Sequence, residues 1–210
     1  MAVSFRGVRF SWHEEFPPLT FSLPASGIAA FHGRAKSGKT AALLAIIGGI
    51  KPVAGEISVL GMDPLRQTRA IRRRVGLSFV EGIYEPYFSL TVADNCRFQA
   101  ALQGQKIETR TVETLLSKVR ADFGPDEVLF RLDPLRRLKV GIALALIGSP
   151  EIVLVDEPFR SLKRNEEEEV KEIFRELKGE GRLVVFTTVK EGELDIADQV
   201  IDMEKGVARK

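Results

Sequence analysis

Short apolar runs and longer amphipathic segments alternate along this chain. Apolar and polar residues alternate over Val3–Trp12, which indicates an edge strand, and a short apolar segment follows the Pro17-Pro18 turn. The run Ile152–Val155 is wholly apolar, as expected of a strand buried on both faces. By these criteria we expect strands at Val3–Trp12, Leu19–Leu23, Ile28–Phe31, Glu56–Leu60, Val75–Val80, Ile152–Val155, Leu183–Phe186 and Val200–Met203.

Helical periodicity occupies the segments between these strands and dominates the chain from Leu90 to Leu146. Thr91 can cap a helix that runs through Phe98, with Asp94 in the capping-box position. Strands that alternate with helices predict an α/β protein with a mostly parallel sheet covered on both faces. The middle helices have no strand partners, which predicts an inserted helical lobe. Further helices are expected at Lys39–Ile47, Pro64–Arg74, Glu108–Val119, Arg136–Ile147 and Asn165–Lys178.

Composition limits the classes of protein to consider. With 210 residues, 44% of them hydrophobic, the chain suits one domain, with a core lobe at 1–82 and 147–210 and a helical lobe at about 83–146. A net charge of +2 provides no drive toward nucleic acid. The single cysteine, Cys96, excludes an internal disulfide. The longest apolar block, Ala41–Ile50, is about half as long as a bilayer-spanning helix, so we expect a soluble, cytoplasmic chain.

The segment from Gly33 to Thr40 fits the phosphate-binding pattern G-x-x-x-x-G-K-[ST], called the P-loop. Its glycines let backbone amides close round a phosphate at a helix N-terminus. Lys39 adds charge at the β- and γ-phosphates, and the Thr40 hydroxyl can bind Mg²⁺. A chance match arises in on the order of one chain in a hundred of this length, and the flanking strand and helix favour the functional interpretation. The candidate nucleotide-binding residues are Gly33, Arg34, Ala35, Lys36, Ser37, Gly38, Lys39 and Thr40.

A pair of carboxylates follows the buried run Ile152–Val155. Asp156 can reach a metal ion through its water shell, and Glu157 is suited to polarise an attacking water. An ordinary surface pair at a strand end is the alternative, but the P-loop upstream favours the chemical role. We therefore expect Mg²⁺ and ATP as cofactors, Thr40 and Asp156 at the metal, and Glu157 as the catalytic residue.

These motifs resemble the ATP-binding-cassette (ABC) ATPase family over nearly the whole chain. The order of segments is similar: an aromatic strand, the P-loop, Val75–Phe79, Leu90–Asn95, and a helix that leads into Asp156-Glu157-Pro158. The resemblance implies a P-loop NTPase of ABC type, with an N-terminal antiparallel β part and an inserted helical subdomain. It also implies a head-to-tail pair of subunits around two ATP molecules, which drives separate membrane subunits from the cytoplasmic face of the membrane.

The resemblance suggests three further roles. Trp12 occupies the place where the family stacks an aromatic ring on adenine, with Phe10 as the fallback and core packing as the alternative for both. Glu81 stands where the family has a loop glutamine, and it either binds Mg²⁺ through water or faces solvent. The membrane subunits are expected to contact Ile83–Asn95. The apolar residues there, which form either a groove or lobe core, are Tyr84, Tyr87, Phe88 and Leu90.

The chain departs from the family where ATP would be enclosed. Leu132–Arg136 replaces the family's Leu-Ser-Gly-Gly-Gln signature and includes a proline, which lacks an N–H. The arginine that ends this segment, or the next one, could meet phosphate or face solvent. Val189 stands at the position of the switch histidine, and Lys163 at that of the aspartate after the second motif. Lys36 stands where the family usually has a small residue and could touch phosphate or face solvent.

The leading hypothesis is an ABC ATPase subunit with weak intrinsic hydrolysis, since losing one positioning donor typically costs about 100- to 1,000-fold in rate. A hetero-pair is favoured over a homodimer, because a partner with an intact signature could complete the site built on Lys39 and Glu157. One alternative is a non-catalytic, ATP-dependent switch or regulatory subunit. A nucleic-acid- or ribosome-linked ABC protein is less favoured, although Arg72-Arg73-Arg74 offers a basic cluster.

Overall fold

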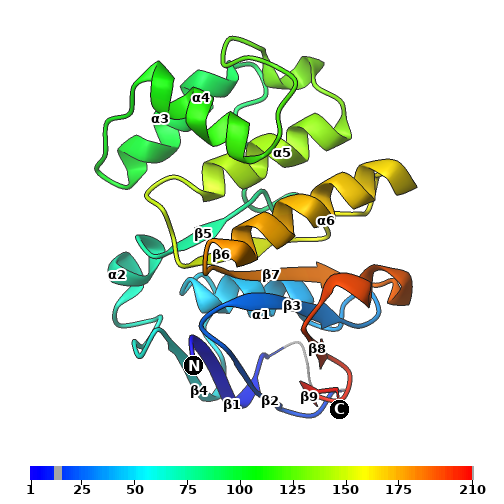
Figure 1. Cartoon of the computed structure of the whole chain (residues 1–210). Helices are drawn as coiled ribbons and strands as arrows, with labels where there is room; N and C mark the ends of the chain where they lie inside the picture. The colour runs from blue at the N-terminus through cyan, green and yellow to red at the C-terminus, as the bar shows by residue number, and fades with distance from the viewer. Residues whose placement is uncertain (12–15, 210) are drawn as a thin grey trace.

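The structure is a computed structural model that describes residues 1–11 and 16–209. A large, mostly parallel sheet runs through its centre (Figure 1). Its strands are β5 (Val75–Leu77), β6 (Ile152–Val155), β7 (Leu183–Thr188), β3 (Gly27–His32), β8 (Gln199–Asp202) and β9 (Val207–Ala208), in that spatial order. Neighbouring strands are parallel except for β8 and β9, which are antiparallel.

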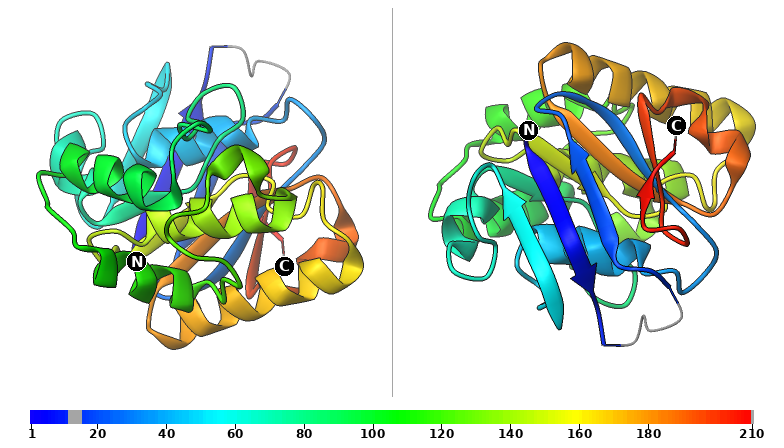
Figure 2. Two further views of the ribbon diagram at one scale, coloured as in Figure 1. Left: turned by 90° about the horizontal axis from the view of Figure 1, so that it is seen from above. Right: turned by 90° about the horizontal axis from the view of Figure 1, so that it is seen from below.

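A smaller antiparallel sheet covers one side of the large sheet. It consists of β2 (Leu19–Leu23), β1 (Val3–Arg9) and β4 (Ala54–Val59), with β1 in the middle. Figure 2 (right) shows this sheet from below, where it forms an outer face of the molecule. Phe5 of β1 stacks on Phe21 of β2 with ring centroids 4.6 Å apart. The N-terminal antiparallel part expected from the resemblance is therefore present.

Helices complete the layers on both faces of the large sheet. On the side of the small sheet, α1 (Lys39–Ile46) packs against β4 and β7. The opposite side is covered by α6 (Arg164–Gly179) and α5 (Pro134–Ala145), with α3 (Val92–Leu102) and α4 (Thr109–Lys118) stacked above them (Figure 1). Short helices at α2 (Thr68–Arg72), η1 (Leu129–Arg131) and η2 (Glu191–Ile196) connect these elements.

Each buried strand feeds two hydrophobic clusters, because side chains alternate between the faces of a strand. In β6, Val153 and Val155 pack in the cluster with α3–α6, and Ile152 and Leu154 pack in the cluster with α1 and the small sheet. The first cluster runs without a break from α3 and α4 to the sheet. The division into a core lobe and a helical lobe at 83–146 therefore stays a prediction.

Several predicted elements differ at their ends. The strands Leu19–Leu23 and Ile152–Val155 have the predicted bounds. The helix predicted at Pro64–Arg74 forms only over Thr68–Arg72, because the Asp63 carboxylate accepts a hydrogen bond from the Leu65 amide (2.8 Å) and holds a turn there. The strand predicted at Val75–Val80 ends at Leu77. The first strand ends at Arg9, and Trp12 lies outside the described residues.

Capping explains where the middle helices begin. Thr91 caps α3 as predicted, since its Oγ1 accepts a hydrogen bond from the Asp94 amide (3.1 Å). Helix α5 begins at Pro134 rather than Arg136, because the Asp133 carboxylate accepts a hydrogen bond from the Arg136 amide (2.9 Å) and proline is favourable at the first helical position. Within residues 1–11 and 16–209, no helix combines the length and apolar character needed to cross a membrane.

Candidate functional site

The P-loop connects β3 to α1 through a backbone that glycine makes possible. Gly38 precedes α1 with φ of 86°, a left-handed conformation that glycine adopts without strain. At Gly33, an added Cβ would lie 2.6 Å from Ser37 Oγ. The Ser37 amide donates to the Arg34 carbonyl oxygen (3.2 Å) and closes a turn inside the loop. Gly33 and Ser37 therefore shape the loop from within.

Lys39 lies almost wholly buried at the start of α1, with its ammonium group folded back onto the loop. Nζ donates to the carbonyl oxygens of Gly33 (2.8 Å) and Arg34 (2.9 Å), and it lies 3.9 Å from Glu157 Oε1. Burial lowers the pKa of Lys39 from its usual value, and the carboxylates of Glu157 and Asp156 offset part of this effect. The loop thus holds a cation in place before any phosphate arrives.

Thr40 and Asp156 meet although they are 116 positions apart in the chain. Thr40 Oγ1 lies 3.0 Å from Asp156 Oδ2 and 3.1 Å from Oδ1. A hydroxyl beside a carboxylate is the oxygen donor set that suits Mg²⁺, which typically takes about one or two protein oxygens and completes its shell with phosphate and water. These two residues could therefore hold the metal.

Thr187, at the end of β7, joins the two acidic residues. Its Oγ1 donates to Asp156 Oδ1 (2.7 Å) and accepts a hydrogen bond from the Glu157 amide (2.8 Å). This residue was not among the predicted site residues. The available signal was a pair of polar residues, Thr187-Thr188, at the carboxyl end of an otherwise apolar strand, where ligands of α/β sheets bind.

A pocket of about 700 Å³ opens between the P-loop and the acidic motif. Glu157 reaches it from a backbone with φ of 41°, a conformation that few non-glycine residues adopt. Val189 lines the pocket at the position predicted for the switch histidine, so no imidazole enters there. The lining residues are Ala35, Lys36, Gly38, Lys39, Thr40, Ala41, Glu157, Arg160 and Val189.

Arg34 and Phe10 lie elsewhere. The Arg34 amide donates to Glu204 Oε1 (2.9 Å), and its guanidinium lies over the Phe16 ring, 5.1 Å from the centroid. Phe10, the fallback for stacking on adenine, is buried in the cluster beneath the small sheet, in agreement with its alternative role in core packing. Trp12 is outside the described residues.

Glu81 lies at the rim and pairs with an arginine. Its Oε2 accepts a hydrogen bond from Arg160 Nη1 at 2.6 Å, and its side chain is 80% exposed. The contact between Thr40 and Asp156 does not include Glu81. Its role at the metal stays a prediction.

The segment that replaces the family signature is held by contacts of its own. The Arg136 guanidinium pairs with Asp122 at 2.6 Å, and Arg137 donates to the Phe130 carbonyl oxygen at 2.7 Å. Arg137 also lies over the Phe88 ring, 5.6 Å from the centroid. Both arginines therefore have protein partners. Lys163 begins α6, where its amide donates to Glu166 Oε2 at 2.7 Å.

A groove of about 470 Å³ separates α1 and β5 from α3. Ile83, with a side chain 63% exposed, and Tyr84 line it from the segment predicted to contact membrane subunits. Tyr84 Oη donates to Gln99 Oε1 of α3 (2.7 Å). Burial raises the pKa of Tyr84 to about 12.

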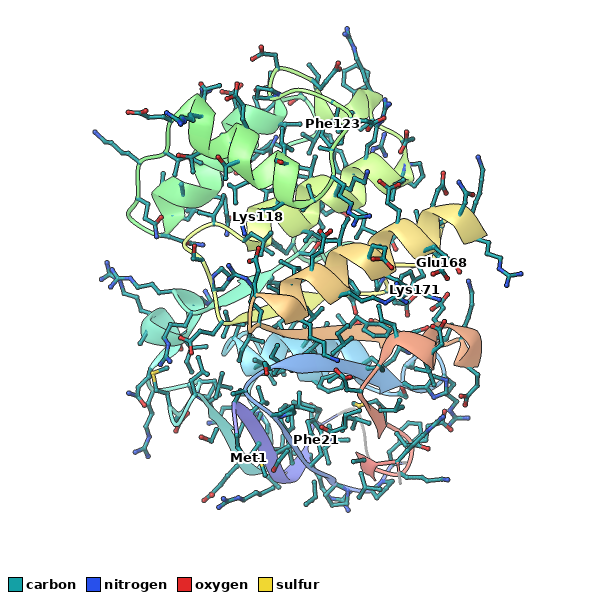
Figure 3. All side chains as sticks on the ribbon, viewed as in Figure 1. Met1, Phe21, Lys118, Phe123, Glu168 and Lys171 are labelled. Carbon is teal, nitrogen blue, oxygen red and sulfur yellow. The ribbon has the colours of Figure 1, made fainter. Side chains whose placement is uncertain are left out.

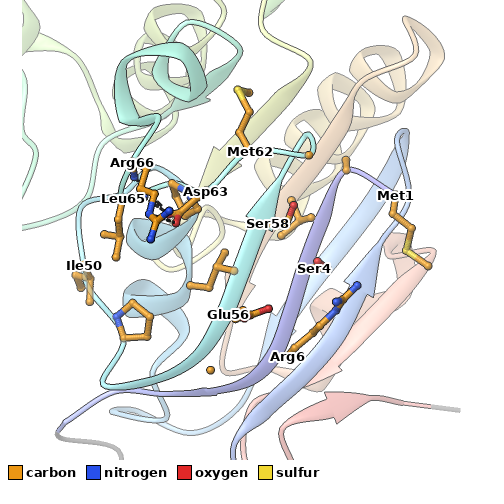
Figure 4. A pocket seen from close by; sticks show the side chains of 17 residues that line it. Met1, Ser4, Arg6, Ile50, Glu56, Ser58, Met62, Asp63, Leu65 and Arg66 are labelled. Carbon is orange, nitrogen blue, oxygen red and sulfur yellow. Dashed lines mark hydrogen bonds and ion pairs between the residues drawn. The ribbon is translucent and has the colours of Figure 1, made fainter.

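A polar hollow of about 660 Å³ lies on the outer face of the small sheet (Figure 4). Ser4 and Arg6 of β1 and Glu56 and Ser58 of β4 line it, and Arg66 pairs with Asp63 at its edge (3.5 Å). It shares no lining residue with the P-loop pocket. We assign it no role in nucleotide binding.

Comparisons with known proteins agree with this geometry. A model of the ABC transporter family matches residues 16–160. The sulfate/thiosulfate import ATP-binding protein CysA of Mycobacterium bovis is 32% identical over 190 residues, covering 89% of this chain and 53% of that protein. The "Probable multidrug ABC transporter ATP-binding protein YbhF" of Escherichia coli is 28% identical over 192 residues, covering 90% of this chain and 33% of that protein. The chain therefore spans about half, or less, of the length of these relatives.

Solved structures show the same fold. The dimeric ATP-binding cassette MJ0796 in a post-hydrolysis state, bound to ADP and Pi, has a TM-score of 0.84 at 18% identity, covering 99% of this chain and 97% of that chain. The cbiO1 protein of Clostridium perfringens, part of the ABC transporter complex cbiONQ, has a TM-score of 0.83 at 19% identity, covering 100% and 87%. Since the family model matches more than half of its length, this chain belongs to the ABC transporter family and has the fold of its ATP-binding cassettes.

Proposed function

We propose that this chain is the ATP-binding and ATP-hydrolysing subunit of a transport complex, with Mg-ATP bound in the P-loop pocket. The observation that carries the proposal is the contact between the two nucleotide motifs, Thr40 Oγ1 to Asp156 Oδ2 at 3.0 Å. Chance motifs so far apart in the chain would not be expected to meet beside a pocket that the P-loop lines.

Each residue of the pocket has a role that follows from its position. The loop amides and the N-terminus of α1 favour phosphate oxygens, and Lys39 can exchange its two carbonyl contacts for them. Thr40 and Asp156 would hold Mg²⁺, which neutralises charge on the phosphates. Glu157 would orient water toward the γ-phosphate, and Thr187 positions its backbone.

Slow hydrolysis by the isolated chain is part of the proposal. The start of α5 carries Pro134, which has no N–H, and its first free amide is already used by Asp133. This segment therefore offers a partner's ATP few donors, whereas the P-loop side retains Lys39 and Glu157. We propose pairing with a second cassette subunit that supplies an intact signature to this chain's ATP.

Sedimentation and ATPase assays test the pairing. The purified chain is expected to stay monomeric with Mg-ATP and to hydrolyse it slowly. An ATP-dependent homodimer with brisk turnover would contradict the hetero-pair, although it would leave ATP binding intact.

The groove beside Ile83 supports a contact with membrane subunits. Apolar side chains on the segment and on the facing helix α3 are exposed, although exposed apolar groups in one region usually mark an interaction site. They are Ile83, Tyr87, Phe88, Leu90, Phe98 and Leu102. We propose that an apolar segment of a membrane subunit docks here and places the chain at the cytoplasmic face of the membrane.

A non-catalytic switch is the second candidate, favoured by Val189 in place of an imidazole at the pocket. In that case ATP binding would close the interface and hydrolysis would be incidental. Glu157→Gln separates the two in the assembled complex. Loss of transport supports a hydrolysing subunit, and unchanged transport supports the switch.

Calorimetry with Mg-ATP tests the site itself. Replacing Lys39 with alanine removes a cation that contacts phosphate, so we expect roughly 10- to 100-fold weaker binding. Lys51→Ala, at an exposed lysine that does not line the pocket, is the matched control. The proposal fails if the wild-type chain takes up no Mg-ATP, or if Lys39→Ala binds it as well as wild type does.

A further inference from the structure

Arg160 is the charged residue of the pocket that neither nucleotide motif contains. It lines the pocket together with Lys39 and Glu157. Its amide donates to the Glu157 carbonyl oxygen at 3.2 Å, which forms a turn immediately after the acidic motif. This turn returns the side chain toward the pocket, where Arg160 Nε lies 4.0 Å from Glu157 Oε2. The guanidinium is therefore beside the residue proposed to orient the attacking water.

The guanidinium of Arg160 holds an exchangeable partner. Its Nη1 donates to Glu81 Oε2 at 2.6 Å, and the two side chains are 65% and 80% exposed. An exposed ion pair is typically worth about 0–1 kcal/mol, because water screens it and two long side chains must be ordered. A guanidinium has five N–H donors in a fork that matches phosphate oxygens. A phosphate entering the pocket would therefore compete effectively with Glu81.

The position of Arg160 selects which phosphate it can meet. Lys39 and the loop amides surround the part of the pocket next to α1, whereas Arg160 and Val189 line it from the loops that follow β6 and β7. Val189 has no hydrogen-bond donor in its side chain, so Arg160 is the cation that those loops contribute to the pocket lining. A group that extends past Lys39 toward Glu157 is the γ-phosphate, which ADP lacks.

We propose that Arg160 binds the γ-phosphate of ATP and gives up Glu81 to do so, so that the pair of residues distinguishes ATP from ADP. This inference rests on the proposed ATP site and deepens it. Before ATP binds, Glu81 occupies the guanidinium as an internal anion. After exchange, Glu81 is released from the pocket rim, two residues before Ile83 in the groove proposed for membrane subunits. The state of the phosphate would thereby reach the docking segment.

Titration calorimetry of the purified chain with Mg-ATP and with Mg-ADP tests the proposal. Arg160→Ala should weaken ATP binding roughly tenfold or more, as expected for loss of a charge-assisted hydrogen bond, and should leave ADP binding within about twofold. Arg160→Lys, which keeps the charge without the fork, should give an intermediate loss for ATP. The matched control is Arg164→Ala, which removes the same charge from an exposed arginine outside the pocket lining. Thermal melts of each variant exclude loss of folding as the cause.

The exchange with Glu81 makes a prediction of opposite sign. Glu81→Gln removes the competing anion, so ATP should bind up to about fivefold more tightly and ADP equally well. Weaker ATP binding by Glu81→Gln would overturn the exchange and favour Glu81 at the metal instead. Equal losses of ATP and ADP affinity in Arg160→Ala, or no loss, would overturn the role of Arg160. If wild type binds neither nucleotide, the proposed function fails with it.

Discussion

At the scale of single residues, the site depends on backbone conformations that cost free energy. Lys36 and Glu157 have φ of 67° and 41° in a region that non-glycine residues seldom adopt. Such a residue typically costs about 1–3 kcal/mol and persists where the surroundings determine it. Both residues line the P-loop pocket. Stability has therefore been given up at the two sides of the pocket where phosphate and water would bind.

Lys36 provides a direct measure of this strain. Lys36→Gly and Lys36→Ala both remove the lysine, but only glycine adopts the positive φ without strain. We expect Lys36→Gly to be more stable than Lys36→Ala by about 1 kcal/mol. Urea unfolding measures the difference. Equal stabilities would mean that the backbone carries no strain at this position.

Thr187 links the backbone of one acidic residue to the side chain of the other. Thr187→Val keeps the shape but leaves the Glu157 amide without its acceptor. We expect a loss of about 1–3 kcal/mol in the free energy of unfolding, together with slower ATP hydrolysis. Thr187→Ser, which retains the hydroxyl, should recover most of both. If Thr187→Val and Thr187→Ser unfold alike, the hydroxyl has no positioning role.

At the scale of elements, the site depends on how closely helices approach the sheet. Helix α5 packs against β5 and β6, and the Ala145 carbonyl oxygen would lie 1.9 Å from a Cβ added at Gly76. Helix α6 covers β7 and β3 on the same face, with Glu168 and Lys171 paired on its surface at 3.0 Å (Figure 3). These helices fix the strand ends that carry Asp156 and Thr187.

Gly76→Ala tests the closeness of α5 to β5. The added methyl group overlaps a backbone atom that cannot rotate away, so we expect destabilisation by about 1–3 kcal/mol or more. Gly179→Ala, where a Cβ would meet nothing within 4 Å, is the control and should be nearly neutral. Denaturant unfolding compares them. A neutral Gly76→Ala would show that the helix packs more loosely than described.

At the scale of the whole molecule, the nucleotide pocket and the groove for membrane subunits lie on opposite ends of one short segment. Glu81 contacts Arg160 at the pocket, and Ile83 lines the groove. Helices α3 and α5 belong to the same buried cluster as the sheet. A shift at the pocket is therefore transmitted to the groove through packed elements.

Charge placed in the groove should separate the two functions. Ile83→Asp and Tyr87→Asp, at side chains 63% and 50% exposed, are expected to release the membrane subunits and to leave Mg-ATP affinity within about twofold. Val53→Asp, 65% exposed and outside the groove, should release nothing. Co-purification from membranes and calorimetry are the measurements. Retention of the membrane subunits by both groove variants would place their contact elsewhere.

Several particular features were predictable from the sequence. The P-loop, the buried strand before Asp156 and the cap at Thr91 depend on residues close together in the chain, and the structure has each of them. The family and its fold are also confirmed. The predicted helix at Pro64–Arg74 was too long, because a turn held by the Asp63 side chain overrides the helical propensity of its first residues.

The sequence by itself determined the phosphate loop and the acidic pair, since glycine conformations, strand burial and the order of motifs are local properties of the chain. Only the tertiary structure decided that Thr187 joins Asp156 to Glu157, that Phe10 is buried, and that Arg160 holds Glu81. Glu81 and Arg160 are 79 positions apart. A contact of that kind depends on where two loops come to lie after the sheet and its helices have packed, and no local pattern encodes it.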